Sequence, residues 1–169
     1  MNKNKQQTVI LKNFRMPDYE QIPDVGLYLD QVAKFINSFL TEFPDMQVTP
    51  SMISNYAKQK LIDRVNRKTY TRDQIAALIM IVLSKTVISI DHIRMMLEDL
   101  RSEDDSLETA YTSFCSSLIN VLKSLSGESY EKMRSPADEK ERMIHNIVTA
   151  IAHKMYVERY FEIRSSSEL

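Results

Sequence analysis

The sequence predicts an all-α fold, and three observations lead to that class. Only two of the 169 residues are glycine, whereas tight β-hairpins depend on residues that accept a positive φ. Over most of the chain, apolar residues recur at the three- and four-residue spacing of amphipathic helices. Hydrophobic residues make up 43% of the chain and charged residues 27%, so the protein can bury a core and is not disordered by composition.

The N-terminal part is expected to be irregular at first and then helical. Residues 1–26 contain Pro17 and Pro23, and each proline disfavours helix at the residue before it. A helical spacing of apolar residues then follows, and Pro44 ends it. We therefore expect a first helix over residues 27–40.

A shorter helix is expected over residues 50–60. Thr49 suits the N-cap position of this helix and Pro50 its first helical position. Its apolar side consists of Ile53, Tyr56, Ala57 and Leu61. Its outward side consists of Ser51, Ser54, Asn55 and Lys58. The stretch that follows, DRVNRKTY, is basic and lacks helical periodicity.

Two more helices are expected after this basic stretch. In the first, over residues 71–84, Thr71 and Gln74 have the spacing of a capping box. Its buried stripe is expected to be Ile75, Leu78, Ile79 and Val82. Ser89 is the expected N-cap of the second helix, whose apolar residues extend to Leu100.

The C-terminal part is expected to contain two longer helices. The first spans residues 105–126 and ends before Gly127, a residue suited to a helix C-terminus. The second spans residues 136–161, with Ser135 as N-cap and a proline in its first turn. The tail, residues 165–169, is expected to be frayed.

Charge is unevenly distributed although the whole chain carries a formal net charge of −1. Residues 49–97 hold eight basic and three acidic side chains, whereas the segment from residue 98 onward holds nine basic and fourteen acidic ones. Such asymmetry is typical of a nucleic-acid-binding part beside a part with another role, although a solvated basic face would look the same. On charge alone we favour the solvated face. The helical pattern divides the chain into one region over residues 27–101 and a two-helix packing or oligomerisation region over residues 102–164.

The segment Val48–Leu97 resembles the DNA-binding half of MerR-type transcription regulators. The resemblance is carried by TPSMISNY (residues 49–56), Leu61-Ile62, the basic residues Arg64–Lys68, YTRDQI (residues 70–75) and SIDHI (residues 89–93). It implies a winged helix-turn-helix head with a small β wing, joined to a C-terminal helical hairpin. The chain departs from the MerR pattern at Ser54, Asn55 and Lys60, which replace an arginine, an aromatic residue and a turn glycine.

The chain is still more similar to a family of uncharacterised bacterial helical proteins known only as a domain of unknown function. This likeness includes PDVGLYLDQVAKFIN, residues 23–37, and is expected to extend over most of the chain. No activity comes with it.

The candidate DNA-binding residues lie on the helix over 50–60 and in the basic stretch. Asparagine can pair with adenine through two hydrogen bonds, serine can contact bases or phosphates, and cations neutralise the phosphate backbone. The resemblance implies that a threonine and a tyrosine of this helix contact phosphates. The candidates are Thr49, Ser51, Ser54, Asn55, Tyr56, Lys58, Lys60, Arg64, Arg67, Lys68 and Arg72.

The two C-terminal helices have two possible roles. They could bury their apolar stripes against each other and against the helix over 27–40, or they could form a homodimer that reads two half-sites in double-stranded DNA. The candidate dimer contacts are Tyr111, Phe114, Met143, Ile147 and Met155.

Other functional classes find little support in the sequence. No catalytic motif, metal-binding motif or phosphate-binding glycine loop is present, so we expect no enzyme, cofactor or metal. The single cysteine, Cys115, is expected to be a core residue in a reducing, cytoplasmic setting, and no apolar run is long enough for a membrane span. A DNA-binding transcription regulator is the leading hypothesis. A protein-interaction module on the same scaffold and a regulator whose tail helices enclose a small-molecule effector are the alternatives.

Overall fold

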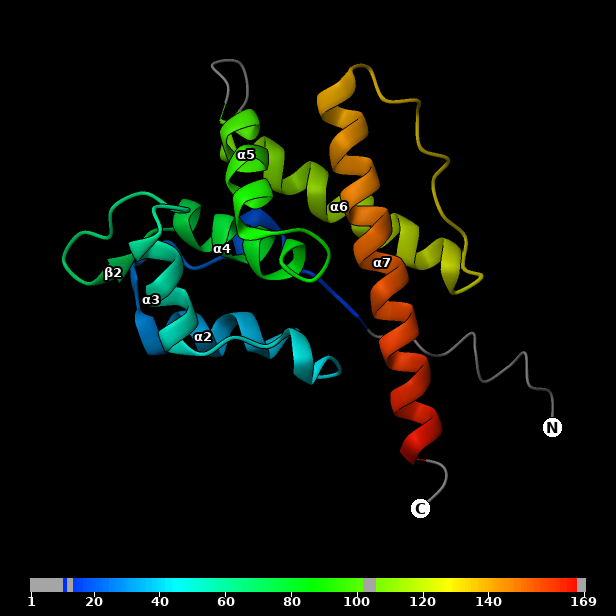
Figure 1. Cartoon of the computed structure of the whole chain (residues 1–169), viewed down its shortest axis with the longest axis horizontal. Helices are drawn as coiled ribbons and strands as arrows, with labels where there is room; N and C mark the ends of the chain where they lie inside the picture. The colour runs from blue at the N-terminus through cyan, green and yellow to red at the C-terminus, as the bar shows by residue number, and fades with distance from the viewer. Residues whose placement is uncertain (1–10, 12–13, 102–105, 167–169) are drawn as a thin grey trace.

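The computed structural model describes residues 11, 14–101 and 106–166, and in them the all-α prediction is confirmed. Figure 1 shows α4 at the centre of the molecule, with the other helices arranged around it. Their bounds are α2 (Leu29–Ser38), α3 (Pro50–Lys58), α4 (Arg72–Ser84), α5 (Ile90–Leu100), α6 (Leu107–Leu125) and α7 (Glu139–Ser166). The short elements are η1 (Tyr19–Gln21), η2 (Pro44–Met46), β1 (Leu27–Tyr28) and β2 (Thr69–Tyr70). None of the described helices is long and apolar enough to cross a membrane.

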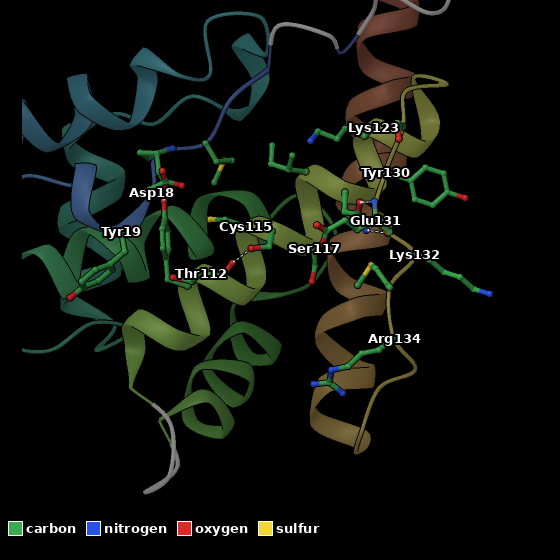
Figure 2. A pocket seen from close by; sticks show the side chains of 18 of the residues that line it. Asp18, Tyr19, Thr112, Cys115, Ser117, Lys123, Tyr130, Glu131, Lys132 and Arg134 are labelled. Carbon is green, nitrogen blue, oxygen red and sulfur yellow. Dashed lines mark hydrogen bonds between the residues drawn. The ribbon is translucent and has the colours of Figure 1, made fainter.

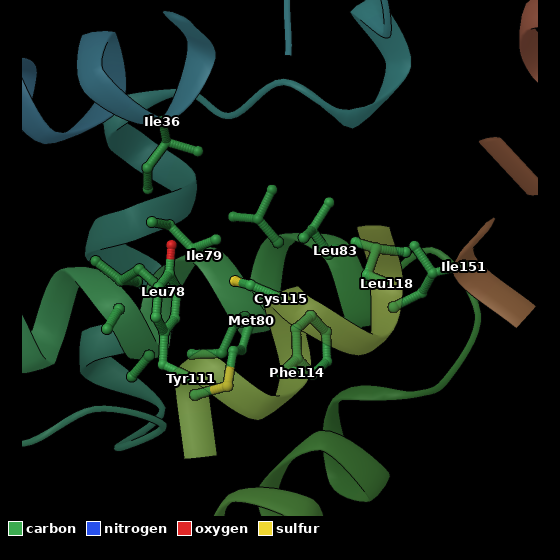
Figure 3. Packing of buried hydrophobic residues seen from close by; sticks show 14 of the residues in the cluster. Ile36, Leu78, Ile79, Met80, Leu83, Tyr111, Phe114, Cys115, Leu118 and Ile151 are labelled. Carbon is green, nitrogen blue, oxygen red and sulfur yellow. The ribbon is translucent and has the colours of Figure 1, made fainter. Parts of the chain in front are cut away.

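Helix α4 is the centre of the core. Every residue from Gln74 to Ser84 is buried, whereas the sequence pattern predicted burial along one stripe only. Helices α5, α6 and α7 all pack against α4, and a helix that is apolar on all sides is stable only when neighbours cover it completely. Figure 3 shows Leu78 and Met80 of α4 beside Tyr111 and Phe114 of α6, and Ile151 of α7 beside Leu118 of α6.

The expected N-caps of three helices are confirmed. The hydroxyl oxygens of Thr49 and Ser89 accept hydrogen bonds from backbone N–H groups three residues later, both at 3.2 Å. Thr71 and Gln74 form the predicted capping box: the Thr71 hydroxyl accepts from Gln74 N at 3.3 Å, and the Gln74 side chain accepts from Thr71 N at 2.9 Å. These caps satisfy N–H groups that have no partner within the helix.

Two predicted helix starts are wrong. Residues 27–28 belong to β1 rather than to a helix, so α2 begins at Leu29. Helix α7 begins at Glu139, because Asp138, not Ser135, receives the backbone N–H of Glu141 at 2.8 Å. Helix α7 also continues to Ser166, past the predicted end at residue 161.

The end of α6 is as predicted. Gly127 has a φ of +69°, and the N–H of the next residue, Glu128, bonds to the carbonyl of Lys123 at 3.0 Å. This is the left-handed termination for which glycine is favoured. The predicted start of α6 at residue 105 falls on residues 102–105, which lie outside the described part. The first helical residue is Leu107, capped by Ser106.

In the described part of the N-terminal segment, residue 11 and residues 14–26, the chain is largely irregular, as predicted, and it is docked on the core. Ile22 is fully buried, and the Tyr111 hydroxyl donates a hydrogen bond to the Pro17 carbonyl at 2.7 Å. The Tyr19 hydroxyl donates to Asp73 at 2.5 Å. Burial, followed by this hydrogen bond, raises the pKa of Tyr19 to about 12.

The candidate dimer contacts are core residues of a single chain. Tyr111, Phe114 and Met155 are fully buried, Ile147 is 9% exposed and Met143 is partly buried against the same cluster. The apolar stripes that contain these residues pack between α6, α7 and α4 within one chain. The prediction that these stripes form a dimer interface is therefore wrong. Cys115 lies in the same core, as expected, and burial raises the pKa of its thiol to about 12.

Candidate nucleic-acid interface

Helix α3 presents a short polar face to solvent. Ser51, Asn55 and Lys58 are exposed and follow one another at helical spacing, and Ser54 is partly exposed. Tyr56 lies on the opposite side and is 5% exposed. Burial raises the pKa of its hydroxyl. The ring of Tyr56 therefore packs in the core, and the contact of its hydroxyl with a phosphate stays a prediction.

The start of α3 is fixed to α2 by one asparagine side chain. The Asn37 Nδ2 donates to the Val48 carbonyl and the Val48 N–H donates to Asn37 Oδ1, both at 2.8 Å. The amide thus pairs with a backbone peptide unit immediately before the Thr49 cap. This contact holds the eleven-residue connection between α2 and α3 in place and sets the direction in which α3 leaves it.

The end of α3 is a left-handed turn made by lysine. Lys60 has a φ of +58°. Its N–H bonds to the Ala57 carbonyl at 3.0 Å, and the Leu61 N–H bonds to the Tyr56 carbonyl at 3.1 Å. This is the Schellman pattern, in which glycine is usual because a Cβ disfavours the left-handed conformation. The MerR pattern has a glycine at this position, and the backbone here keeps the conformation that suits one.

Replacing Lys60 with glycine is therefore expected to stabilise the protein by up to about 1 kcal/mol. The gain is limited because glycine also adds freedom to the unfolded chain. A shift of the urea midpoint at constant slope measures it. Lys58→Gly, inside α3, is the matched control and should destabilise by about 1 kcal/mol. A lower midpoint for Lys60→Gly would contradict the prediction.

Helix α5 braces the same end of α3. Arg94 Nη1 donates to the Gln59 carbonyl at 2.7 Å, and Arg101 Nη2 donates to the Leu61 carbonyl at 3.2 Å. Charged donors make stronger hydrogen bonds than neutral ones. Both arginines thus fix the position of α3 and of the chain that leaves it, a role that no sequence pattern indicated.

The basic stretch folds into a tight hairpin. Its N-terminal end is held by the buried side chain of Gln74, which donates to the carbonyls of Asp63 and Arg64 at 3.0 and 3.2 Å. Asn66 pairs with Thr69, and Thr69 in turn pairs with Tyr28 of β1. We call residues 66–69 the basic hairpin.

Two cations form the tip of the basic hairpin. Arg67 and Lys68 both have positive φ, 53° and 62°, the combination found in two-residue hairpin turns of type I′. Such turns usually contain asparagine or glycine. Here arginine and lysine adopt the same backbone conformation, so the scarcity of glycine in the chain did not exclude a hairpin. Figure 1 shows β2 and the loop beside it next to α3, at the end of the molecule away from α7.

Positive charge on this end of the molecule is not neutralised by neighbouring acids. Five exposed cations lie on α3, on the turn that ends it and in the basic stretch that follows. None of them forms an ion pair with another described residue: Lys58, Lys60, Arg64, Arg67 and Lys68. The acidic side chain nearest to them in sequence, Asp63, is 3.7 Å from Arg101. We call these five cations, with Ser51 and Asn55, the basic surface.

Arg72, a further candidate, has a structural role. Its Nε donates to the Ile22 carbonyl at 2.8 Å, and its guanidinium lies 5.4 Å from the centre of the Tyr19 ring. Arg72 thus ties the N-terminal segment to α4 and is half-buried. Conversely, the sequence analysis missed Tyr28, which it placed in a helix. Tyr28 is 60% exposed beside the basic hairpin.

Comparison with known proteins identifies a family but no activity. No curated protein matches the chain, and no solved structure matches it. In the described residues, no group of three or more potential ligands could hold a metal ion. A family model described as a domain of unknown function, DUF1836, matches residues 17–114, which is more than half of the chain. The chain therefore belongs to the DUF1836 family, as the expected likeness to a family of unknown function indicated.

Proposed function

We propose that this protein binds double-stranded DNA as a transcription regulator, with α3 in the major groove and the basic hairpin against the phosphate backbone. The observation that carries the proposal is the basic surface, where five exposed cations that pair with no described acid accompany a polar helix face. Unpaired cations at this density favour a polyanionic partner, because releasing counterions from DNA drives binding.

The order of elements also fits a winged helix-turn-helix domain. In this reading α2 and α3 are the helix-turn-helix pair, the basic hairpin is the wing, and α4 and α5 support them. The connection between α2 and α3 is longer than the usual three or four residues, and the Asn37 contacts compensate by fixing it. The MerR resemblance supports this reading from the sequence alone.

Within this proposal the residues of the basic surface divide into two roles. Asn55, at the centre of the exposed face, can form two hydrogen bonds with adenine, and Ser51 can contact a neighbouring base or phosphate. The cations contact phosphates and carry no sequence information by themselves. Tyr28, exposed beside the basic hairpin, adds a hydroxyl that can donate to a phosphate.

The double substitution Arg67→Ala/Lys68→Ala tests the proposal. It should weaken binding to all duplex sequences and reduce the slope of log affinity against log salt by roughly two, because two phosphate contacts are lost. A fluorescence-anisotropy titration at several salt concentrations measures both. The matched control is Lys123→Ala/Lys132→Ala, which removes the same charge from exposed residues far from the basic surface in sequence.

An equal loss in both double variants would mean that net charge alone drives binding, and no loss in either would remove the hairpin from the interface. Selection from randomised duplexes then separates the remaining possibilities. A palindromic motif would establish a homodimeric regulator, and binding without a motif would indicate a non-specific DNA binder. No binding at low salt would reject the proposal and favour an acidic protein as the partner of the basic surface.

A further inference from the structure

Two hollows lie beside the loop between α6 and α7, and neither favours one class of ligand. The larger, of about 670 Å³, carries charges of both signs on its wall, and Figure 2 shows Tyr130 and Lys132 pointing away from it. On the wall of the smaller, of about 510 Å³, Arg134 already pairs with Glu141 at 2.6 Å. A surface with a more defined chemical character lies on α5.

The outer side of α5 is an uncovered helix face with an apolar residue at its centre. Figure 1 shows α5 in front of α4, on which it packs. The buried side of α5 consists of Ile93, Met96, Leu97 and Leu100. Met95 lies on the opposite side of the helix and is 61% exposed. One apolar side chain of α5 therefore faces water.

Three carboxylates surround Met95 on this face. Asp91 lies four residues before it, and Glu98 and Asp99 lie three and four residues after it, so all three are its neighbours on the helix surface. Each of the three is exposed, and none forms an ion pair with another described residue. We call Met95 and these three carboxylates the acidic face of α5.

The arginines of this region do not neutralise the acidic face of α5. Arg94 stands three residues after Asp91 and four before Glu98, spacings at which opposite charges pair along a helix. Arg101 has the same relation to Glu98. Both arginines instead donate to backbone carbonyls at the end of α3, and the carboxylate beside Arg101 is that of Asp63. The sequence thus offers ion pairs along α5 that the fold does not make.

Two of the three carboxylates are also unfavourably placed in the field of the helix dipole. Asp91 lies in the first turn of α5, where negative charge is stabilising, but Glu98 and Asp99 lie near its C-terminal end, and the last turn holds no basic residue. Unpaired charges that lower the stability of the free protein are more readily understood if a cationic partner neutralises them.

We propose that the acidic face of α5 binds a cationic amphipathic helix of another protein. One apolar side chain of that helix packs on Met95, and lysines or arginines on either side of it pair with the three carboxylates. Residues 91–99 span about 12 Å along the helix, so two to three turns of the partner cover them. Helices are commonly recognised through side chains spaced three and four residues apart.

Other occupants of this face fit less well. The carboxylates repel a nucleic acid, so the face is not a second DNA contact. A second copy of this chain offers the cations of its basic surface, but that surface contains no apolar residue to cover Met95. The inference does not depend on DNA binding, because none of its residues belongs to the basic surface.

The test is an NMR titration of the full, ¹⁵N-labelled chain with a designed peptide. The peptide is a capped alanine-based helix with one leucine and four lysines placed three or four residues from it, and its counterpart carries glutamines in place of the lysines. At low salt we expect saturable shifts of α5 amides with the lysine peptide. Its affinity should exceed that of the glutamine peptide at least threefold, because exposed charge pairs are lost in the latter.

Glu98→Gln/Asp99→Asn should weaken binding of the lysine peptide about two- to thirtyfold, the effect of two exposed charge pairs. The same variant should raise the urea midpoint, because two charges that oppose the helix dipole are removed. A merely structural role of the carboxylates would lower it. The matched control, Glu20→Gln/Glu131→Gln, removes the same charge from exposed residues of other elements and should leave the affinity unchanged.

Met95→Ala is the second variant, and it should weaken binding by a factor that salt does not change, since the lost contact is apolar. Absence of saturable shifts on α5 would overturn the proposal. So would undiminished binding by the folded Glu98→Gln/Asp99→Asn variant or an equal loss in the control. Self-association of the chain that salt and this double variant both abolish would make a second copy the occupant, and would overturn it as well.

Discussion

A chain that ends at Arg101 is expected to lose its cooperative unfolding transition. The truncation removes α6 and α7, both of which pack directly on α4. Five side chains lost with them are fully buried: Tyr111, Phe114, Leu118, Ile151 and Met155. At about 2 kcal/mol each, their burial contributes roughly 10 kcal/mol, which is comparable with the whole stability of a typical domain.

Thermal melting followed by circular dichroism measures this effect. The shortened chain should melt gradually and bind a hydrophobic dye, because one side of α4 is left bare. A chain ending at Ser166 is the control, since it keeps every described residue, and should melt as the full chain does. A sharp melt of the shortened chain would instead mean that residues 1–101 fold independently.

Gln74→Met is expected to destabilise the protein by about 2–4 kcal/mol. The substitution keeps the side-chain length and removes an amide that makes three hydrogen bonds while being 7% exposed. The carbonyls of Asp63 and Arg64 would lose this donor, and the Thr71 N–H would lose its acceptor. Because these carbonyls anchor the basic hairpin, affinity for DNA should also fall.

Urea denaturation measures the loss of stability, and the anisotropy titration measures the loss of affinity. Gln59→Met is the matched control: Gln59 is only partly buried, so the exchange should change stability by no more than about 0.5 kcal/mol. Equal stability of the two variants would show that the amide of Gln74 is not needed to hold the hairpin.

The helices and their caps could be predicted because they depend on short-range patterns. Thr49, Thr71 and Ser89 each act on backbone groups only three residues away. The start of α7 was misplaced because Ser135 and Asp138 are both good caps, and only the packing of the loop decides between them. Strand β1 was missed because its partner, β2, lies about forty residues away.

The role of a buried stripe was harder to predict than its existence. Tyr111 and Phe114 show the same periodicity whether they pack within one chain or between two. The uninterrupted apolar run in α4, from Ile75 to Leu83, did contain a usable signal, since a helix without a polar side must be covered all round. For Tyr56 the periodicity correctly predicted burial of the ring, and the phosphate contact that the resemblance implies stays a prediction.

The exposed residues of the candidate interface could be predicted from the sequence. The residues that hold α3 in position could not. Ser51, Asn55 and the cations were identifiable from their spacing and charge. The contacts of Asn37 with residue 48 and of Arg94 with residue 59 join segments far apart in sequence. No local pattern distinguishes those two side chains from other polar residues on a helix surface.

The basic hairpin carries Arg67 and Lys68 on a two-residue turn rather than on a flexible loop. The backbone beneath both charges is therefore ordered before any partner arrives, so binding loses only side-chain freedom. Their close spacing also makes each charge raise the electrostatic potential felt by the other. Contact with an anion relieves that repulsion, so the turn is preorganised for a partner with closely spaced negative charges.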